Sequence, residues 1–139
     1  MSTPVAFKLI TPTDVAFDGE AELVIATGTE GEEGILAHHA PFLTALKPGV
    51  LRANVVGDSG QTRRLELATS EGFMQALPQR VTVIVDRALR FEDVDVAHAR
   101  QELAEALERQ ARVSTESPEF AREQSAIDFA NAKLRLTGH

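Results

Sequence analysis

Apolar and polar residues alternate through most of the first 87 residues, and turn residues interrupt the alternation repeatedly. A period of two is typical of half-buried strands, and Gly, Pro and Asp between such runs predict turns. No helical period occurs before residue 90. The pattern predicts an all-β sandwich or flattened barrel. Its expected strands are Val5–Ile10, Val15–Phe17, Glu20–Thr27, Phe42–Leu46, Val50–Val56, Thr62–Thr69, Gly72–Leu77 and Arg80–Val85.

The third run, Glu20–Thr27, has a regular alternation of residues. Its alternation predicts a half-buried antiparallel strand. The residues of its two faces are Ala21, Leu23 and Ile25 on one side and Glu20, Glu22 and Val24 on the other. Asp18-Gly19 before this run is a strong hairpin signal, so we expect a turn there.

A compact polar loop, Thr29–Gly34, is expected next. Gly31 and Gly34 supply positive φ where a side chain would clash, so the backbone can turn sharply there. The apolar run Phe42–Leu46 is short enough to be one buried strand. Pro48-Gly49 after it is a turn dipeptide that leads into the next strand.

Beyond residue 90, apolar residues recur at helical spacing. Glu92–Asp95 supply capping carboxylates for a first helix that runs from Val94 to Arg112. Ser117-Pro118 is typical of the N-cap and first residue of a second helix, which ends near Gly138. The predicted fold class is therefore α+β. An N-terminal antiparallel β-sandwich (residues 1–87) precedes a C-terminal two-helix antiparallel hairpin (residues 88–139).

Charges on the first helix also favour helix formation. Glu105–Arg109 and Glu108–Arg112 are i,i+4 pairs in the favourable orientation, so we expect two ion pairs within this helix. From residue 88 onward acidic residues outnumber basic ones, and the hairpin is net acidic.

The second helix carries two apolar stripes. Phe120, Ile127 and Leu134 share one side, whereas Phe129 and Leu136 lie nearly opposite. The partner helix can cover only one stripe, so the other is either covered by the sandwich or kept for another subunit. Because helices this short are marginal alone in water, we expect the hairpin to detach and re-dock.

Composition narrows the function classes. The chain has 139 residues, a net charge of −7 and no cysteine. The acidic balance argues against a nucleic-acid partner, and the lack of cysteine excludes disulfides and thiolate metal sites. No apolar run approaches the ~20 residues that span a bilayer, so we expect no direct membrane insertion. The N-terminus has no secretory or transit pattern, and the chain is interpreted as cytosolic and bacterial in style.

A set of motifs resembles one protein family. Gly31-Glu32-x-Gly34-Ile35, His39-x-Pro41 and Pro48-Gly49 are similar to the signature of the epsilon subunit of F-type ATP synthases. Glu71-Gly72-Phe73 and the run from Val81 to Ala88 lie where that family has its sheet-closing strands. One departure lies inside the signature, because many members have Pro-Gly where this sequence has Ala37-His38.

The resemblance implies a non-catalytic central-stalk subunit, and no catalytic motif of the common enzyme classes occurs in this sequence. In the family, the sandwich joins the gamma subunit to the ring of c subunits and so couples proton translocation to ATP synthesis. This implies a peripheral location at the cytoplasmic side of a bacterial inner membrane. The loop with the Gly-Glu motif faces the polar loops of the c ring, and Glu32 is the matching residue. The expected ring contacts are Glu30, Gly31, Glu32, Glu33, Gly34, His38, His39 and Pro41.

By the same resemblance the hairpin is a regulatory element. In relatives that inhibit ATP hydrolysis, the helices extend and cationic side chains meet acidic segments of the catalytic alpha and beta subunits. The acidic balance of this hairpin weakens that attraction. An alternative is that the subunit assembles normally while its hairpin has lost any regulatory role.

Nucleotide binding is expected to be weak. ATP-binding relatives carry Ile-Asp-x-x-Arg-Ala at the start of the first helix, where this sequence has Val94-Asp95-Val96-Ala97-His98-Ala99. His98 replaces a permanently charged, forked phosphate ligand, so we expect no resident cofactor. The candidate nucleotide contacts are Asp95, His98, Arg122 and Lys133.

The adjacent histidines leave a second hypothesis open. With Glu32 and Glu33 nearby, His38 and His39 suggest a stand-alone β module that binds a metal or a small ligand. Adjacent residues on a strand point to opposite faces, however, and a metal site needs three or four convergent ligands. We therefore expect no metal, with one histidine packed and the other exposed beside a subunit contact.

Overall fold

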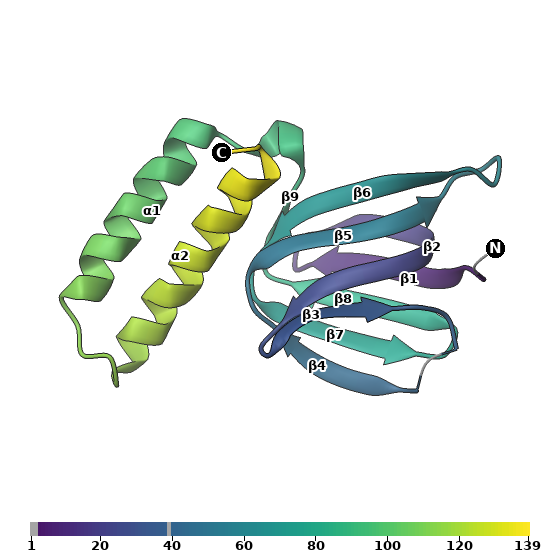
Figure 1. Cartoon of the computed structure of the whole chain (residues 1–139), viewed down its shortest axis with the longest axis horizontal. Coiled ribbons are helices and arrows are strands. Elements are labelled where there is room, and N and C mark those ends of the chain that lie inside the picture. Colours follow the sequence, from purple (N-terminus) through teal and green to yellow (C-terminus); the bar gives the residue numbers. More distant parts are fainter. Residues whose placement is uncertain (1–2, 39) are drawn as a thin grey trace.

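The computed structural model describes residues 3–38 and 40–139, and in that part of the chain strands come first and helices last (Figure 1). The strands are β1 (Val5–Thr11), β2 (Asp14–Gly28), β3 (Gly31–Ile35), β4 (Phe42–Leu46), β5 (Gly49–Val56), β6 (Thr62–Thr69), β7 (Gly72–Leu77), β8 (Arg80–Val85) and β9 (Ala88–Leu89). A single 3-10 turn, η1 (Phe91–Asp93), leads to the helices α1 (Val96–Ala111) and α2 (Pro118–Leu136).

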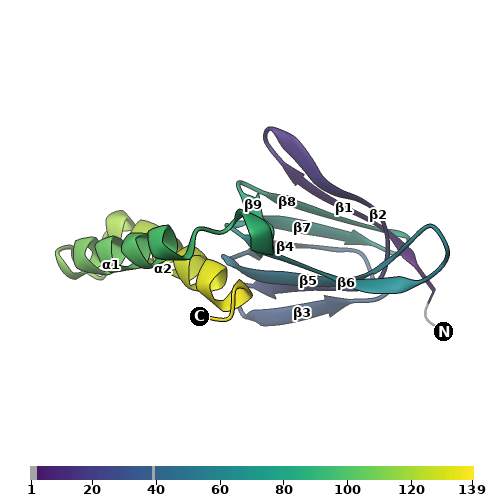
Figure 2. The same ribbon diagram turned by 90° about the horizontal axis from the view of Figure 1, so that it is seen from above.

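The strands form one sheet that folds back on itself into two layers (Figure 2). Strands β8, β7 and β4 follow one another in one layer, and β5, β6 and β9 in the other. β1 and β2 pair with each other and join the layers, and β3 pairs with β2. The predicted class, a β-sandwich followed by two helices, is confirmed. One pairing is not antiparallel as expected: β1 and β8 run parallel, with Phe7 opposite Val81.

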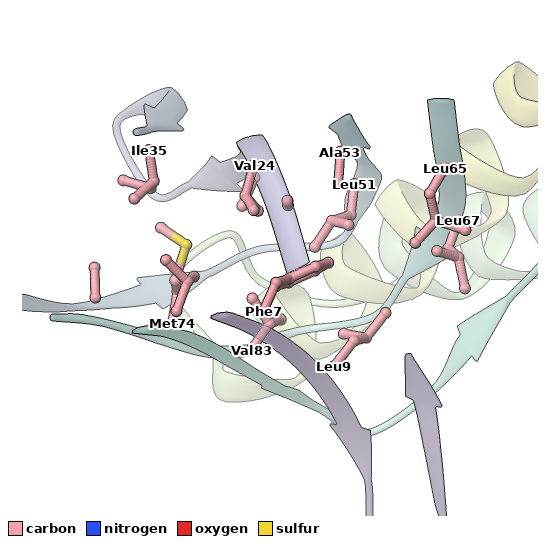
Figure 3. Packing of buried hydrophobic residues seen from close by; sticks show 14 of the residues in the cluster. Phe7, Leu9, Val24, Ile35, Leu51, Ala53, Leu65, Leu67, Met74 and Val83 are labelled. Carbon is pink, nitrogen blue, oxygen red and sulfur yellow. The ribbon is translucent and has the colours of Figure 1, made fainter. Parts of the chain in front are cut away.

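The core between the layers is built from aliphatic side chains of both (Figure 3). Leu9 of β1, Leu51 of β5 and Met74 of β7 are fully buried there. The ring of Phe7 is buried as well, and it lies 5.4 Å from the ring of Phe17. This core fixes the relative position of the two layers and leaves their outer faces for other contacts.

The turn predicted at Asp18-Gly19 is wrong. β2 runs without a break through this dipeptide, and the chain turns at Pro12-Thr13 instead. Gly19 has a different role, because a Cβ there would lie only 3.0 Å from the ring of Phe17. The missing side chain leaves room for that ring, so the glycine serves packing inside a long strand.

The face assignment predicted for Glu20–Thr27 is wrong in its second half. Ala21 is buried as expected, but so is Val24, and Leu23 is only half-buried. The register between β2 and β5 shifts between Ala21 and Leu23. An extra residue in one strand reverses the alternation beyond it, which explains why the later residues exchange faces.

The predicted polar loop Thr29–Gly34 is mostly a strand. Thr29-Glu30 forms the turn, and the residues after it pair with β2 as β3. Gly31 adopts a φ of +128° as predicted, whereas Gly34 has no positive φ. β4 forms where expected but is not a buried strand, since Leu43 is 69% exposed.

Both helices have predicted capping residues as their N-caps, although the first begins at Val96 and not at Val94 as expected. The Asp95 carboxylate accepts a hydrogen bond from the backbone N–H of His98 (3.1 Å), and the Ser117 hydroxyl accepts one from Phe120 (3.2 Å). These bonds satisfy donors that the first turn of a helix leaves free. No helix in the described part of the chain is long and apolar enough to cross a membrane.

Of the two ion pairs predicted within the first helix, only Arg112–Glu108 forms. Arg109 does not pair with Glu105, because its Nε donates to both carboxylate oxygens of Glu123 on α2 (3.0 and 3.1 Å). The hydrogen bonds to Glu123 raise the pKa of Arg109 above its ordinary value. This interaction joins α1 to α2 and therefore stabilises the hairpin as a unit.

The hairpin is attached to the sandwich through α2, and α1 packs on α2 on the side away from the sheet (Figures 1 and 2). The residues in contact are Phe129, Ala132 and Leu136 of α2 with Val50, Ala68 and Leu89 of the sandwich. Of the two alternatives for the second apolar stripe, coverage by the sandwich is the one found here.

Gly72, the first residue of β7, has no room for a side chain. A Cβ would lie 2.0 Å from the carbonyl oxygen of Ile84 and 2.8 Å from Cα of Val85, and these backbone atoms cannot rotate away. We expect Gly72→Ala to lower the free energy of unfolding by about 2 kcal/mol or more, as measured by urea denaturation.

Gly57→Ala is the matched control for this substitution. Its Cβ would meet only the Gln61 carbonyl oxygen, at an ordinary 3.5 Å. Its effect should stay within roughly 0.5 kcal/mol. Equal stability of the two variants would contradict the clash at Gly72.

Candidate functional site

The acidic residues predicted to meet a partner lie on the β2–β3 hairpin. Glu30 is exposed in the turn, Glu32 is exposed on β3, and Glu33 is half-buried. Among the described strands β3 pairs only with β2, so its other edge is open. The hairpin therefore presents carboxylates along an accessible edge of the sandwich.

Glu32 is engaged within the chain by Arg52 of β5, whose guanidinium donates to its carboxylate. The Glu32 side chain is 56% exposed and that of Arg52 is 28% exposed. A pair this accessible to water stabilises a fold by only about 0–1 kcal/mol. Glu32 can therefore exchange Arg52 for a group of another molecule at little cost.

The predicted ring contacts do not form one continuous loop, because β3 lies between them. Glu30 and Gly31 precede β3, whereas His38 and Pro41 follow it, at the other end of the sandwich (Figure 1). The backbone N–H of His38 donates to the carbonyl of Pro78 in the β7–β8 turn (2.7 Å), which holds that end in place. His39 lies outside the described residues.

His38 occupies a turn and not a strand, and its φ is +66°. The left-handed region is the one that glycine enters without a steric cost. The backbone at this position therefore suits a glycine, although the residue here is a histidine. Among the described residues, no group of three or more His, Cys, Asp or Glu side chains is placed to hold a metal ion.

The candidate nucleotide contacts divide into two groups. Arg122 and Lys133 line a cleft of about 290 Å³ between α1, α2 and the sandwich. Asp95 is used as the N-cap of α1, and His98 lies beside Glu102 with Nδ1 3.4 Å from its carboxylate. Neither Asp95 nor His98 is among the residues that line the cleft.

Charges in this cleft are balanced. Its acidic lining residues are Glu71, Asp86, Glu102 and Glu105, and its basic ones are Arg87, Arg109, Arg122 and Lys133. Glu102 binds Lys133, and Glu123 binds Arg109. Two of the four cations are therefore already paired with carboxylates, which leaves little positive potential for a phosphate group.

An apolar stripe crosses the outer face of the layer that α2 does not cover. Ile10, Ile84, Phe73 and Ala45 stand in register on four neighbouring strands, and Leu43 lies two residues from Ala45. Phe73 is 57% exposed and Ile84 is 52% exposed. The sequence pattern missed this surface, although its signal is visible as apolar residues on both faces of these strands.

Comparisons with known proteins agree on one family. Residues 4–91 match the family model described as ATP synthase, Delta/Epsilon chain, beta-sandwich domain. The ATP synthase epsilon chain of Chromobacterium violaceum is 38% identical over 128 residues, which are 92% of this chain and 89% of that protein. The epsilon chain of Syntrophobacter fumaroxidans is 34% identical over 136 residues, or 98% of this chain and 97% of that one.

Solved structures show the same fold. A chain in the cryo-EM structure of the Euglena gracilis mitochondrial ATP synthase aligns with a TM-score of 0.77 at 19% identity and covers 98% of this chain and 82% of its own. A chain of the Tetrahymena thermophila mitochondrial ATP synthase central stalk aligns with a TM-score of 0.61 at 16% identity, over 98% of both chains.

The left-handed backbone at His38 should lower the stability of the chain. We expect His38→Gly to raise the free energy of unfolding by roughly 0.5–1 kcal/mol, because relief of the backbone strain exceeds the entropy that glycine adds to the unfolded chain. Ala37→Gly is the control at the neighbouring position, which has no positive φ. It should destabilise instead. Urea denaturation measures both, and a loss of stability in His38→Gly would contradict the strain.

Proposed function

Since this chain belongs to the ATP synthase epsilon-chain family, we propose that it joins the gamma subunit to the ring of c subunits in the rotor and so couples proton translocation to ATP synthesis. It is a non-catalytic subunit of the complex. Its place is at the cytoplasmic side of a bacterial inner membrane, as a peripheral component of the assembled enzyme.

The apolar stripe on β1, β8, β7 and β4 is the observation that carries this proposal. Leu43, Phe73 and Ile84 are each more than half exposed, although each could have been a polar residue on a solvent-facing strand position. Contiguous exposed apolar side chains of this kind mark protein contacts. α2 packs on one end of the opposite layer, at Val50, Ala68 and Leu89, and beyond that contact this outer face carries exposed charged side chains such as Arg64 and Glu66. We therefore assign the apolar stripe to the gamma subunit.

The β2–β3 hairpin is the part that meets the c ring. It holds the Gly31-Glu32 motif at an open sheet edge, where Glu32 can leave Arg52 for a polar group of a partner. His38 and Pro41 lie at the other end of β3, so they belong to a separate contact beside the β7–β8 turn. The two ends would meet different parts of the rotor.

The hairpin of α1 and α2 would regulate ATP hydrolysis by leaving the sandwich and reaching the catalytic subunits. In the described part of the chain, the apolar contact with the sandwich comes from α2, and α1 packs mainly on α2. ATP would bind this hairpin weakly, since Lys133 already has Glu102 as its partner.

The gamma contact can be tested with charged residues in the stripe. We expect Phe73→Glu and Ile84→Glu each to weaken binding to a gamma-containing alpha–beta–gamma core by about a hundredfold, because a carboxylate would be desolvated in an apolar contact. Phe91→Glu in η1 is the matched control, since Phe91 is 59% exposed but lies outside both the stripe and the helical hairpin. Surface plasmon resonance with the full chain gives the affinities. Unchanged binding of both stripe variants would exclude this face.

Regulation by the hairpin can be tested with a cross-link. The Ser125 hydroxyl on α2 donates to the Glu71 carboxylate of the sandwich (3.3 Å), and the natural chain has no cysteine. In the Glu71→Cys, Ser125→Cys double variant, a short bismaleimide should hold the hairpin docked. We expect the unlinked variant to slow ATP hydrolysis by the core and the linked one to leave it unchanged. Equal inhibition by both forms would show that undocking is not required.

A further inference from the structure

Lys133 is an unusual residue of the docked hairpin, because its ammonium group is buried. It is only 4% exposed, although it lies on a helix next to the surface cleft. Burial of an unpaired ammonium is costly, so such a group persists only where other side chains compensate the charge. The side chains around Lys133 are therefore the ones that stabilise the docked position of the hairpin.

One carboxylate and one aromatic ring supply that compensation. Glu102 of α1 accepts a hydrogen bond from the Lys133 ammonium. The ring of Phe129, one turn earlier on α2, lies 4.7 Å from the same nitrogen. The guanidinium of Arg87, from the segment between β8 and β9, lies over this ring as well, at 5.0 Å. Phe129 therefore links a cation of the helix to a cation of the sandwich.

The apolar contact around this cluster is modest. Apart from Phe129, it consists of aliphatic side chains from α2 and the sheet, two of them alanines. Cation–π contacts contribute more when they are shielded from water, and the Phe129 ring is only 7% exposed. The charged cluster around Phe129 can therefore contribute a large part of the stability of the docked hairpin.

We propose that Phe129, Lys133, Arg87 and Glu102 form a latch that keeps the hairpin docked without any bound ligand. Glu102 couples the position of α1 to the docking of α2, because removal of its carboxylate leaves the Lys133 ammonium unpaired unless α2 moves away from the sandwich. Arg109 is likewise held by Glu123. Docking thus needs no anion to neutralise these two cations. The inference rests on the proposed regulatory role of the hairpin and names the residues that control it.

Hydrogen–deuterium exchange of the isolated full chain tests the latch directly. We expect Phe129→Leu and Glu102→Ala each to raise the exchange rate of the α2 amides about tenfold, since hydrogen bonds to charged groups and buried cation–π contacts are of that strength. The double variant Glu102→Ala, Lys133→Met should return toward the natural rate, because the uncompensated charge is gone. A packing role for Glu102 alone would not produce this rescue.

Glu108→Ala is the matched control for Glu102→Ala. It removes the same side chain from the same helix, but its ion pair with Arg112 is largely exposed. Its α2 exchange should stay within about twofold of the natural chain. Exchange of β7 and β8 amides reports whether each variant keeps its sandwich fold.

Two results would overturn the latch. One is unchanged α2 exchange in Phe129→Leu and Glu102→Ala with an intact sandwich. The other is a natural chain whose α2 is protected only after ATP or inorganic phosphate is added. Because these measurements use no ATPase assay, they separate failure of the latch from failure of the regulatory role, which is judged by hydrolysis with the cross-linked chain.

Discussion

Strand β2 is the element on which the rest of the sandwich depends, because it pairs with β1, β3, β4 and β5. A strand that serves both layers cannot keep one constant inward face along its length. The register shift between Ala21 and Leu23 changes which face points inward, and the side chain of Val24 therefore lies in the core. The acidic β2–β3 hairpin and the junction with β1 are both consequences of this one long strand.

The sequence pattern correctly predicted those elements whose buried face depends only on the alternation of their own residues. Strands β5 to β8 and both helix caps are of this kind, because each has one inward face or a capping side chain near in sequence. It failed at Gly19 and at Leu23. The role of Gly19 depends on the ring of Phe17, and the face of Leu23 depends on its register with β5, so neither can be read from neighbouring residues.

The candidate site was predictable in part for a similar reason. The resemblance predicts Glu32 as a ring contact, which stays a prediction, and it did not foresee the pairing of Glu32 with Arg52 from another strand. The motif also placed Glu30 and His38 close in sequence, whereas β3 holds them apart in space. Which outer face is free could not be decided from alternation, since both faces carry apolar residues. The structure distinguishes them, because one carries the exposed side chains of Phe73 and Ile84 and the other carries exposed charges and the contact with α2.

The two outer faces therefore differ in the strength of contact that they can support. The stripe with Phe73 and Ile84 has large, exposed apolar side chains, as the proposed lasting contact with the gamma subunit requires. The contact under α2 offers only three apolar side chains of the sandwich, Val50, Ala68 and Leu89, together with the Arg87 cation beside Phe129. Small apolar area keeps the free energy of docking low, while the charged cluster determines the position. We expect a helix held in this way to dock in one defined place and still be able to leave, as the proposed regulation requires.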